Sequence, residues 1–402
     1  MRIAVGAWVL GALVLIQPAP AQNLKTDTKQ KSPGESSINT PSSVGGKRLD
    51  EWKKELASDD ASRRATAILA VLEFGDDAAS CVPLILQRLN DTDVSPRARA
   101  LLALRTMSID EKDVPAIVRG IATRLVPPTE TQAIIRYEAA LSLYRYIADG
   151  SPAIPSLIQA TMDRSSWEIR HHAVALLWRI GVATNKDNTP DARITEALLA
   201  ALRFEKTNKV KLEIIQGLGM MGRPSSGMLL SKVVSELSLC ATHRNRPLAI
   251  WAYAGLVSMQ DGQAADQALN TIAKFLKNED LDTRIQAAAA LGALQDKAKK
   301  KVPALLEMLS DKEPFAVQAA ASALGGINDQ SDSVISALIQ LTDNKDSSVA
   351  GGGVIGLVRL KQNNARVLAV LDKMLEKKDL DRRLRFLVED GIKELKKPTP
   401  KK

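Results

Sequence analysis

A repeat of about 35 residues runs through nearly the whole chain and limits the fold more than any other feature. Ten positions can be aligned, 33 to 41 residues apart. Seven residues after each position the side chain is aliphatic in all ten copies, and six residues after it the side chain is small in nine. This spacing predicts a helix with one close-packing face in every repeat. The aligned anchor positions are Arg64, Arg97, Arg136, Arg170, Lys211, Ala249, Arg284, Val317, Ala350 and Arg385.

A second helix is expected before each anchor helix, because several begin with an aliphatic residue followed by proline. The pairs are Val82-Pro83, Val114-Pro115, Ile154-Pro155 and Val302-Pro303. Proline suits the first helical turn, where its missing N–H would have no partner within the helix. A single hydrophobic core stops growing near about 250–300 residues, whereas stacked hairpins extend without limit. We therefore predict an all-α fold, an α-solenoid of about ten antiparallel helical hairpins over residues 49–398.

The repeats resemble HEAT repeats, in particular the short bacterial type called phycobilisome-lyase HEAT-like repeats. The segments that resemble the family's first helix are CVPLILQRL, DVPAIVRGI, AIPSLIQAT and KVPALLEML. Those that resemble its second helix are RRATAILAVLEFG, IRHHAVALLWRIG and TRIQAAAALGALQ. The resemblance implies a superhelix whose second helices line a concave side. It implies little about chemistry, because function resides in sites rather than in folds.

The first 48 residues have the order of an export signal followed by a tether. Arg2 precedes an apolar run of fourteen residues, and Ala19-Pro20-Ala21 matches a small-x-small cleavage site. A membrane anchor is the competing interpretation, but fourteen residues are fewer than the roughly 20 that span a bilayer. Residues 1–21 are interpreted as a cleaved signal peptide and 22–48 as a disordered tether rich in Ser, Thr and Lys. We therefore expect a secreted or periplasmic protein.

The net charge of +9 lies at the ends of the chain. Residues 49–362 carry 37 basic and 37 acidic side chains, whereas the tether and the last forty residues, with a basic tail at 399–402, are positive. A protein that binds nucleic acid normally concentrates positive charge on its folded surface. We therefore expect no nucleic-acid partner, and membrane contact only through the basic ends.

No catalytic, metal or cofactor site can be assembled from the sequence, so we expect no enzyme activity and no cofactor. The HEAT-like hydroxylase that modifies a translation factor uses His-Glu pairs to hold iron, and none occurs among the three histidines. His171-His172 is interpreted as a solvated polar pair rather than a metal site. Cys81 and Cys240 are expected to be buried apolar groups rather than a redox pair.

The expected function is an exported HEAT-repeat scaffold that recognises a protein or peptide on its concave face. The alternative is an enzyme or chromophore-handling subunit of the HEAT-like lyase type. Aromatic residues concentrate in repeats three to six, where they either fill the core or form a recognition surface. Positions two and nine after the anchors are expected to face the groove. The resulting partner-binding candidates are Arg99, Glu138, Arg145, His172, Arg179, Glu213 and Trp251.

Three consecutive glycines, Gly351 to Gly353, fall inside a predicted helix, where each costs about 1 kcal/mol relative to alanine. Close contact between adjacent hairpins would offset that cost. A weak, flexible joint is the other interpretation. The sequence does not decide between the two.

The signal-peptide interpretation makes one direct prediction. Protein expressed in its native host should begin at Gln22, or within a residue or two of it, when its N-terminus is sequenced. Recovery of a chain that keeps Met1 in the membrane fraction would contradict cleavage and favour the anchor.

Overall fold

The structure, a computed structural model, describes residues 41–185, 189–360 and 365–396. Across these ranges the chain is helical and forms no β-strand, apart from one isolated bridge between Val44 and Lys47. All ten anchor positions fall within the second helix of a hairpin. The predicted all-α solenoid of ten antiparallel hairpins is therefore confirmed. The expected signal peptide, most of the tether and the basic tail lie outside the described residues.

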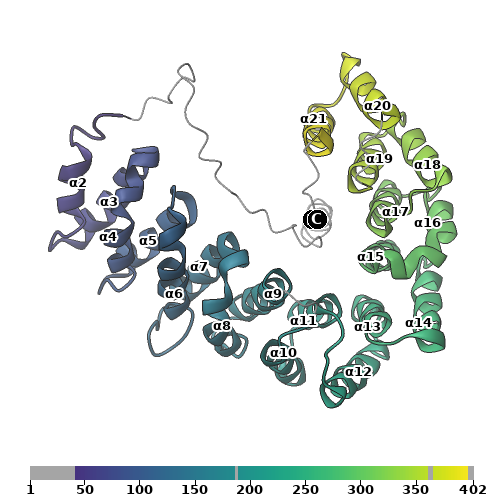
Figure 1. The fold of residues 1–402 in the computed structure, drawn as a ribbon, viewed down its shortest axis with the longest axis horizontal. Coiled ribbons are helices and arrows are strands. Elements are labelled where there is room, and N and C mark those ends of the chain that lie inside the picture. Colours follow the sequence, from purple (N-terminus) through teal and green to yellow (C-terminus); the bar gives the residue numbers. More distant parts are fainter. Residues whose placement is uncertain (1–40, 186–188, 361–364, 397–402) are drawn as a thin grey trace. The chain divides into compact units, whose positions relative to one another are not determined.

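The chain divides into two compact units, residues 18–225 and residues 226–402. In the N-terminal unit the first helices (α6, α8 and α10) form one row and the second helices (α7, α9 and α11) form another (Figure 1). Its helices are α2 (Leu49–Glu55), α3 (Ala61–Leu72), α4 (Val82–Arg88), α5 (Val94–Thr106), α6 (Val114–Thr123), α7 (Ala133–Leu143), α8 (Ile154–Ala160), α9 (Trp167–Ala183), α10 (Ala192–Phe204) and α11 (Asn208–Met221). Short 3₁₀ turns include η1 (Gly75–Cys81) and η3 (Tyr144–Asp149).

The C-terminal unit repeats the same two-layer arrangement. Its helices are α12 (Gly227–Ala241), α13 (Arg246–Met259), α14 (Gly262–Phe275), α15 (Leu281–Ala293), α16 (Val302–Met308), α17 (Pro314–Ile327), α18 (Asp332–Thr342), α19 (Ser347–Arg359), α20 (Ala365–Glu376) and α21 (Arg382–Lys396). The residues that the spacing placed seven after each anchor lie in the core between layers, from Val71 at 0% exposed to Ile392 at 8%. Each hairpin thus buries its apolar face only against its neighbours.

The local start signals behave as expected. Pro83, Pro115, Pro155 and Pro303 each occupy the first turn of a first helix. Neither cysteine forms a disulfide bond among the described residues. Cys81 is fully buried at the end of η1, as expected, whereas Cys240 is only half-buried in α12.

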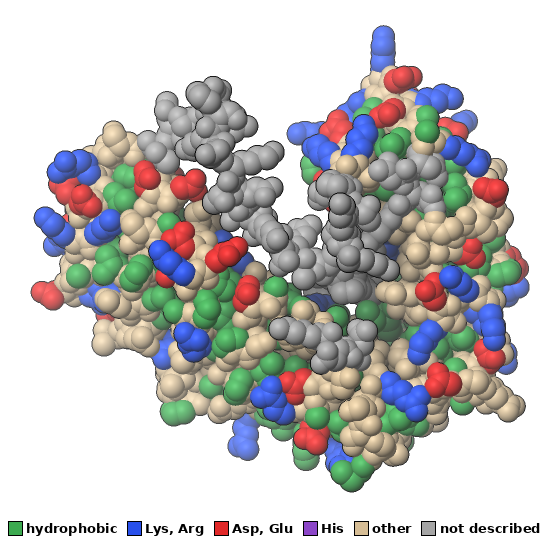
Figure 2. All heavy atoms as spheres, in the orientation of Figure 1, with side chains coloured by type: hydrophobic (Ala, Val, Ile, Leu, Met, Phe, Trp, Pro, Cys, Tyr) green, Lys and Arg blue, Asp and Glu red, His purple; other side chains and the backbone are tan. Residues whose placement is uncertain are grey.

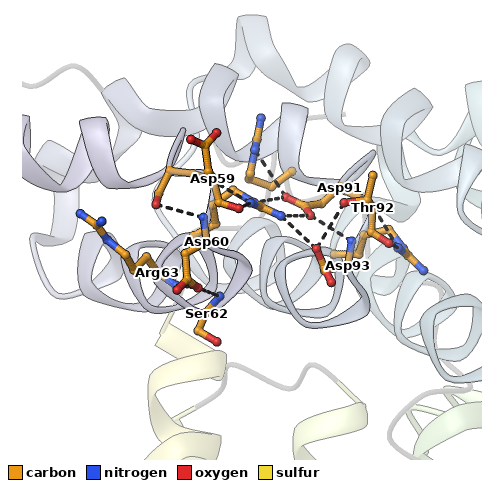
Figure 3. Close-up of polar contacts among 11 residues, drawn as sticks. Asp59, Asp60, Ser62, Arg63, Asp91, Thr92 and Asp93 are labelled. Carbon is orange, nitrogen blue, oxygen red and sulfur yellow. Dashed lines mark hydrogen bonds and ion pairs between the residues drawn. The ribbon is translucent and has the colours of Figure 1, made fainter.

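Buried arginines join successive hairpins of the N-terminal unit, and this role of the anchor position was not predicted. The Arg64 guanidinium donates through Nη1 to the carbonyl oxygens of Ser58 and Asp59, both at 2.9 Å, in the turn of its own hairpin. Through Nε and Nη2 it donates to both carboxylate oxygens of Asp91 in the next hairpin, at 2.7 and 2.6 Å. Asp91 and Asp93 lie in the turn before α5, across from the Asp59 and Asp60 turn (Figure 3). The Arg64 side chain therefore binds the turn of its own hairpin and the turn of the next hairpin at the same time.

The same contact recurs three more times without interruption. The ion pairs are Arg97 with Glu130 at 2.8 Å, Arg136 with Asp163 at 2.9 Å, and Arg170 with Glu205 at 2.7 Å. We call the four pairs from Arg64 to Arg170 the arginine ladder. In the C-terminal unit Arg284 pairs with Asp311 in the same way at 2.8 Å, whereas the anchor positions Ala249, Val317 and Ala350 carry no charge.

Electrostatics favour the charged form of these buried acids. Burial alone would raise the pKa of Glu205, but hydrogen bonds from Arg170 and from the backbone N–H groups of Thr207 and Lys206 overcome it and lower the pKa to about 2. Against burial, the pKa of Asp91 is lowered by Arg64 and a backbone donor, and that of Asp163 by the Ser165 hydroxyl, the Ser165 backbone N–H and Arg136. These three acids therefore stay charged at neutral pH.

Glycines bring α19 of the C-terminal unit close to its neighbouring helices. A Cβ atom at Gly352 would lie 2.9 Å from the Cα of Gln318 in α17, and one at Gly353 would lie 2.7 Å from the carbonyl oxygen of Leu338 in α18. At Gly351 the nearest atom, in the side chain of Leu387, is 3.5 Å away, which is an ordinary contact. Close contact between adjacent hairpins therefore explains Gly352, and close contact with the first helix of the same hairpin explains Gly353, so the flexible-joint interpretation is not needed.

Neighbouring glycines should respond to alanine in opposite directions. Gly353→Ala should lower the free energy of unfolding by about 1–3 kcal/mol, because the new methyl group meets backbone that cannot move aside. Gly351→Ala is the matched control in the same helix and should raise it by up to about 1 kcal/mol, because it adds helix propensity without a clash. Urea unfolding followed by circular dichroism measures both, and equal effects would contradict the close-contact account.

Candidate functional site

The partner-binding candidates from the sequence gather on one surface of the N-terminal unit. Arg99 lies in α5, Glu138 in α7, His172 and Arg179 in α9, and Glu213 in α11, and all are partly exposed. Arg145 follows α7 in η3 and is exposed. We call this surface the second-helix face and define it by Arg99, Arg105, Glu138, Arg145, His172, Arg179 and Glu213.

Trp251 is an exception, and its predicted orientation is wrong. It lies on α13 in the C-terminal unit, where it is only 3% exposed. Its indole Nε1 donates to Oε1 of Gln286 on α15 at 2.8 Å. Trp251 therefore fills core space and is not available to a partner.

Side chains on the second-helix face pair across the hairpins in a fixed register. The residue two after one anchor meets the residue eight or nine after the preceding anchor. Arg105 of α5 thus pairs with Glu138 of α7 at 3.4 Å, and Arg179 of α9 pairs with Glu213 of α11 at 2.7 Å. Glu138, Arg179 and Glu213 are therefore brought into contacts between hairpins in this register, and His172 joins it as described next.

An aromatic and imidazole cluster occupies the centre of the face. The Tyr144 hydroxyl and Nδ1 of His172 are 3.0 Å apart, which joins the end of α7 to α9. The ring of Tyr137 meets that of His172 edge to face, with centroids 5.4 Å apart, and His171 and Trp167 continue the contacts along α9. These residues are partly exposed, unlike Trp178, which is 5% exposed. The aromatic concentration thus divides into core and surface members.

The environment of the cluster keeps its imidazoles neutral. Desolvation by burial, with a smaller contribution from the neighbouring His171, lowers the pKa of His172 to about 4. Burial also lowers the pKa of His171 and raises that of the Tyr144 hydroxyl. At neutral pH the cluster therefore offers uncharged rings and hydrogen-bonding groups.

Cations flank the cluster, and two of them have no carboxylate partner among the described residues. Arg99 makes no hydrogen bond or ion pair within those residues. Arg145 donates only to carbonyl oxygens, those of Arg105 at 3.0 Å and Met107 at 2.7 Å, and so caps the end of α5. Arg179 stacks on the indole of Trp178, with its guanidinium carbon 4.1 Å from the ring centroid.

The sequence missed Arg105 as part of this site. It stands eight residues after the anchor Arg97, one position before the residues that were chosen. The signal was present in the repeat, because a residue at this spacing lies at the end of the second helix. Only the observed pairing shows that residues eight and nine after an anchor both contact the residue two after the next anchor.

Within the described ranges, no group of three or more His, Cys, Asp or Glu side chains is arranged to hold a metal ion. None of the helices in those ranges combines the length and hydrophobicity needed to cross a bilayer. On the molecular face in Figure 2, side chains of both charge signs are interspersed over the described surface. This mixing agrees with the neutral composition of residues 49–362.

Comparisons with known proteins place HEAT repeats in the C-terminal unit. A family model for HEAT repeats matches residues 234–325, from α12 into α17. The match supports a HEAT-repeat family for the chain and does not distinguish the phycobilisome-lyase-like type. No curated protein matches the sequence.

Several known structures resemble the chain at low sequence identity. A crystal structure of an engineered protein has 20% identity and a TM-score of 0.43, covering 87% of this chain and 99% of that one. A chain from a structure of Kap95p binding to RanGDP has 14% identity and a TM-score of 0.41, covering 86% of this chain and 50% of that one. A chain from a homology model of the AP-3 complex has 15% identity and a TM-score of 0.44, covering 86% and 68%.

The lowered pKa of His172 predicts a pH dependence of stability. Its unfolded value is near 6.5 and its folded value about 4, so the unfolded chain gains a proton as the pH falls through 6.5 while the folded chain does not. The free energy of unfolding should therefore fall as the pH is lowered from 6.5 to about 4. Below about pH 4 this group should cause no further change in it. His172→Gln should flatten this part of the profile, as measured by urea unfolding at several pH values. A slope identical to that of the wild type would contradict the neutral-imidazole account.

Proposed function

We propose that the protein is an exported, non-enzymatic HEAT-repeat scaffold that binds a protein or peptide on the second-helix face of its N-terminal unit. The observation that carries this proposal is the combination of arginines, tyrosines and a tryptophan on a surface held by buried ion pairs. Arginine and aromatic residues are the types most enriched at the energetic centres of protein interfaces. Export is inferred from the order of the first 21 residues.

A rigid frame beneath the face supports a binding role. The arginine ladder fixes successive turns, and the pairs Arg105–Glu138 and Arg179–Glu213 hold face side chains between hairpins. Side chains that are already ordered lose less conformational entropy when a partner binds. The face is therefore better prepared for recognition than a set of freely moving surface residues.

The corresponding surface of the C-terminal unit is less suited to a partner. Two residues after the anchors of α17 and α19 stand Ala319, which is 1% exposed, and Gly352, which is also buried. Gln286, at the equivalent position of α15, accepts the hydrogen bond from Trp251. Small and buried groups at these positions leave little side-chain surface for recognition, so we place the binding face in the N-terminal unit.

The test compares two faces of the same hairpins in the native host. Affinity purification followed by mass spectrometry should recover a protein with the wild type that is lost with Arg145→Ala combined with Arg179→Ala. These side chains lie at the surface, so the variant should keep the helical circular dichroism of the wild type. Arg119→Ala is the matched control, because Arg119 is exposed on the first helix α6.

Deletion of residues 22–48 should leave recovery of that protein unchanged. A membrane or polyanion partner predicts the reverse, with binding carried by the basic ends and lost steeply as salt rises. Loss of the partner on removing the tether, with the face variant unaffected, would show that the binding surface lies elsewhere.

A further inference from the structure

We propose that the second-helix face binds an acidic peptide segment in an extended conformation. This inference rests on the proposed function and names the chemistry of the partner. It is carried by the positions and unsatisfied hydrogen-bonding capacity of Arg99 and Arg145, together with the aromatic cluster beside them.

Arg99 is a partly exposed cation. Among the described residues, no carboxylate lies within ion-pair distance of its guanidinium. By the register of the face, its counterpart is Glu73, nine residues after Arg64 and directly after the end of α3. No ion pair joins the two side chains. The Arg99 guanidinium is therefore able to bind a carboxylate from outside the chain without first breaking an ion pair or hydrogen bond within it.

Arg145 is held in place while part of its guanidinium remains available. Both of its hydrogen bonds, to the carbonyl oxygens of Arg105 and Met107, are donated by Nη1. Nε and Nη2 donate to no other described residue. These two nitrogens form one edge of the planar guanidinium, the edge that binds a carboxylate with two parallel hydrogen bonds. The contacts to α5 thus orient this edge in advance.

The separation of the two cations suits an extended chain. Arg145 is bonded to the carbonyl of Arg105, six residues after Arg99 in α5, which corresponds to about 9 Å along the helix axis at 1.5 Å per residue. An extended peptide in the polyproline II conformation advances about 3.1 Å per residue with three residues per turn, so carboxylates three residues apart lie on one side of the peptide and span this distance. A peptide with acidic residues at that spacing could therefore contact both guanidiniums.

The aromatic cluster gives such a peptide a second anchor. Tyr144 precedes Arg145 directly, and its hydroxyl contacts His172 on α9. Tyr137 and His172 present partly exposed, uncharged rings next to the cations. An apolar or aromatic side chain adjacent to the acidic residues would cover these rings and gain from their burial.

The remaining charges of the face favour a peptide over nucleic acid. Arg105 and Arg179 are already paired with Glu138 and Glu213, so the face carries carboxylates as well as cations. A nucleic acid carries a phosphate at every nucleotide and would meet these carboxylates, whereas a peptide can place acidic residues only where the cations are.

The experiment uses the full mature chain and labelled synthetic peptides. The probe is a fluorescein-labelled 15-residue peptide of Asp, Glu, Ser and Tyr, with acidic residues three apart, and the matched peptide carries Asn and Gln in place of every acid. Fluorescence anisotropy should show the acidic peptide binding at least about tenfold more tightly than its neutral match. Arg99→Glu should weaken it by about tenfold or more, because it reverses a charge at the binding position.

Two further variants separate binding from folding. Arg119→Glu makes the same charge reversal on the first helix α6 and should change the dissociation constant by less than about twofold. Arg145→Gln should weaken binding to an intermediate degree, because it removes the charge and retains one hydrogen-bonding group. Circular dichroism establishes that each variant is folded, and Arg99→Glu breaks no hydrogen bond among the described residues.

Three outcomes would overturn the proposal. The acidic and neutral peptides could bind equally, Arg99→Glu could leave binding unchanged, or a labelled oligothymidylate of 15 nucleotides could bind as tightly as the acidic peptide with the same dependence on Arg99. If the face variant still abolishes capture of the host partner while the acidic peptide does not bind, the second-helix face remains the binding surface and only the acidic chemistry is wrong.

Discussion

The buried arginine at the anchor position is the contact on which the N-terminal unit depends. Arg64, Arg97 and Arg136 are buried, at 3% to 8% exposed, and Arg170 is partly exposed. Each guanidinium donates to carbonyl and carboxylate oxygens. A buried ion pair need not stabilise a fold relative to apolar residues of the same volume. Loss of one partner is different, because it leaves a buried charge and costs about 3–5 kcal/mol. The ladder therefore acts chiefly by specifying one register between hairpins, since any shift would leave several charges unpaired.

The two units solve the same packing problem by different means. In the N-terminal unit long polar side chains occupy the space between the exposed edges of second helices, as with Arg179 and Glu213. In the C-terminal unit glycine and alanine let the backbones approach, so that Gly292 and Ala323 are already in van der Waals contact and a Cβ on the glycine would be 2.8 Å from the alanine Cα. Close approach gains dispersion contacts but removes the side chains that could contact a partner. At a given position of the repeat, the second helix can therefore carry either long side chains that contact a partner or small residues that let the helices pack closely.

Much of the fold could be predicted because repetition averages out local ambiguity. A single helix with small and aliphatic residues is a weak signal, but ten copies in register leave few other folds. The ladder could not be predicted in the same way, because the partner of each arginine lies in a turn of the following hairpin, at separations that vary from 27 residues for Arg64 and Asp91 to 35 for Arg170 and Glu205. Pattern matching at a fixed period does not find a contact whose spacing varies.

The error at Trp251 has a related cause. Six candidates chosen by helical position do lie at the surface, yet Trp251 at the same position of α13 is enclosed and bonded to Gln286 of α15. Helix geometry fixes the direction of a side chain, whereas the distance between helices decides whether solvent or another helix meets it. That distance depends on the size of side chains in two hairpins together. In the N-terminal unit residues such as Tyr144 and His172 keep the helix edges apart, and in doing so they form the surface that we assign to a partner.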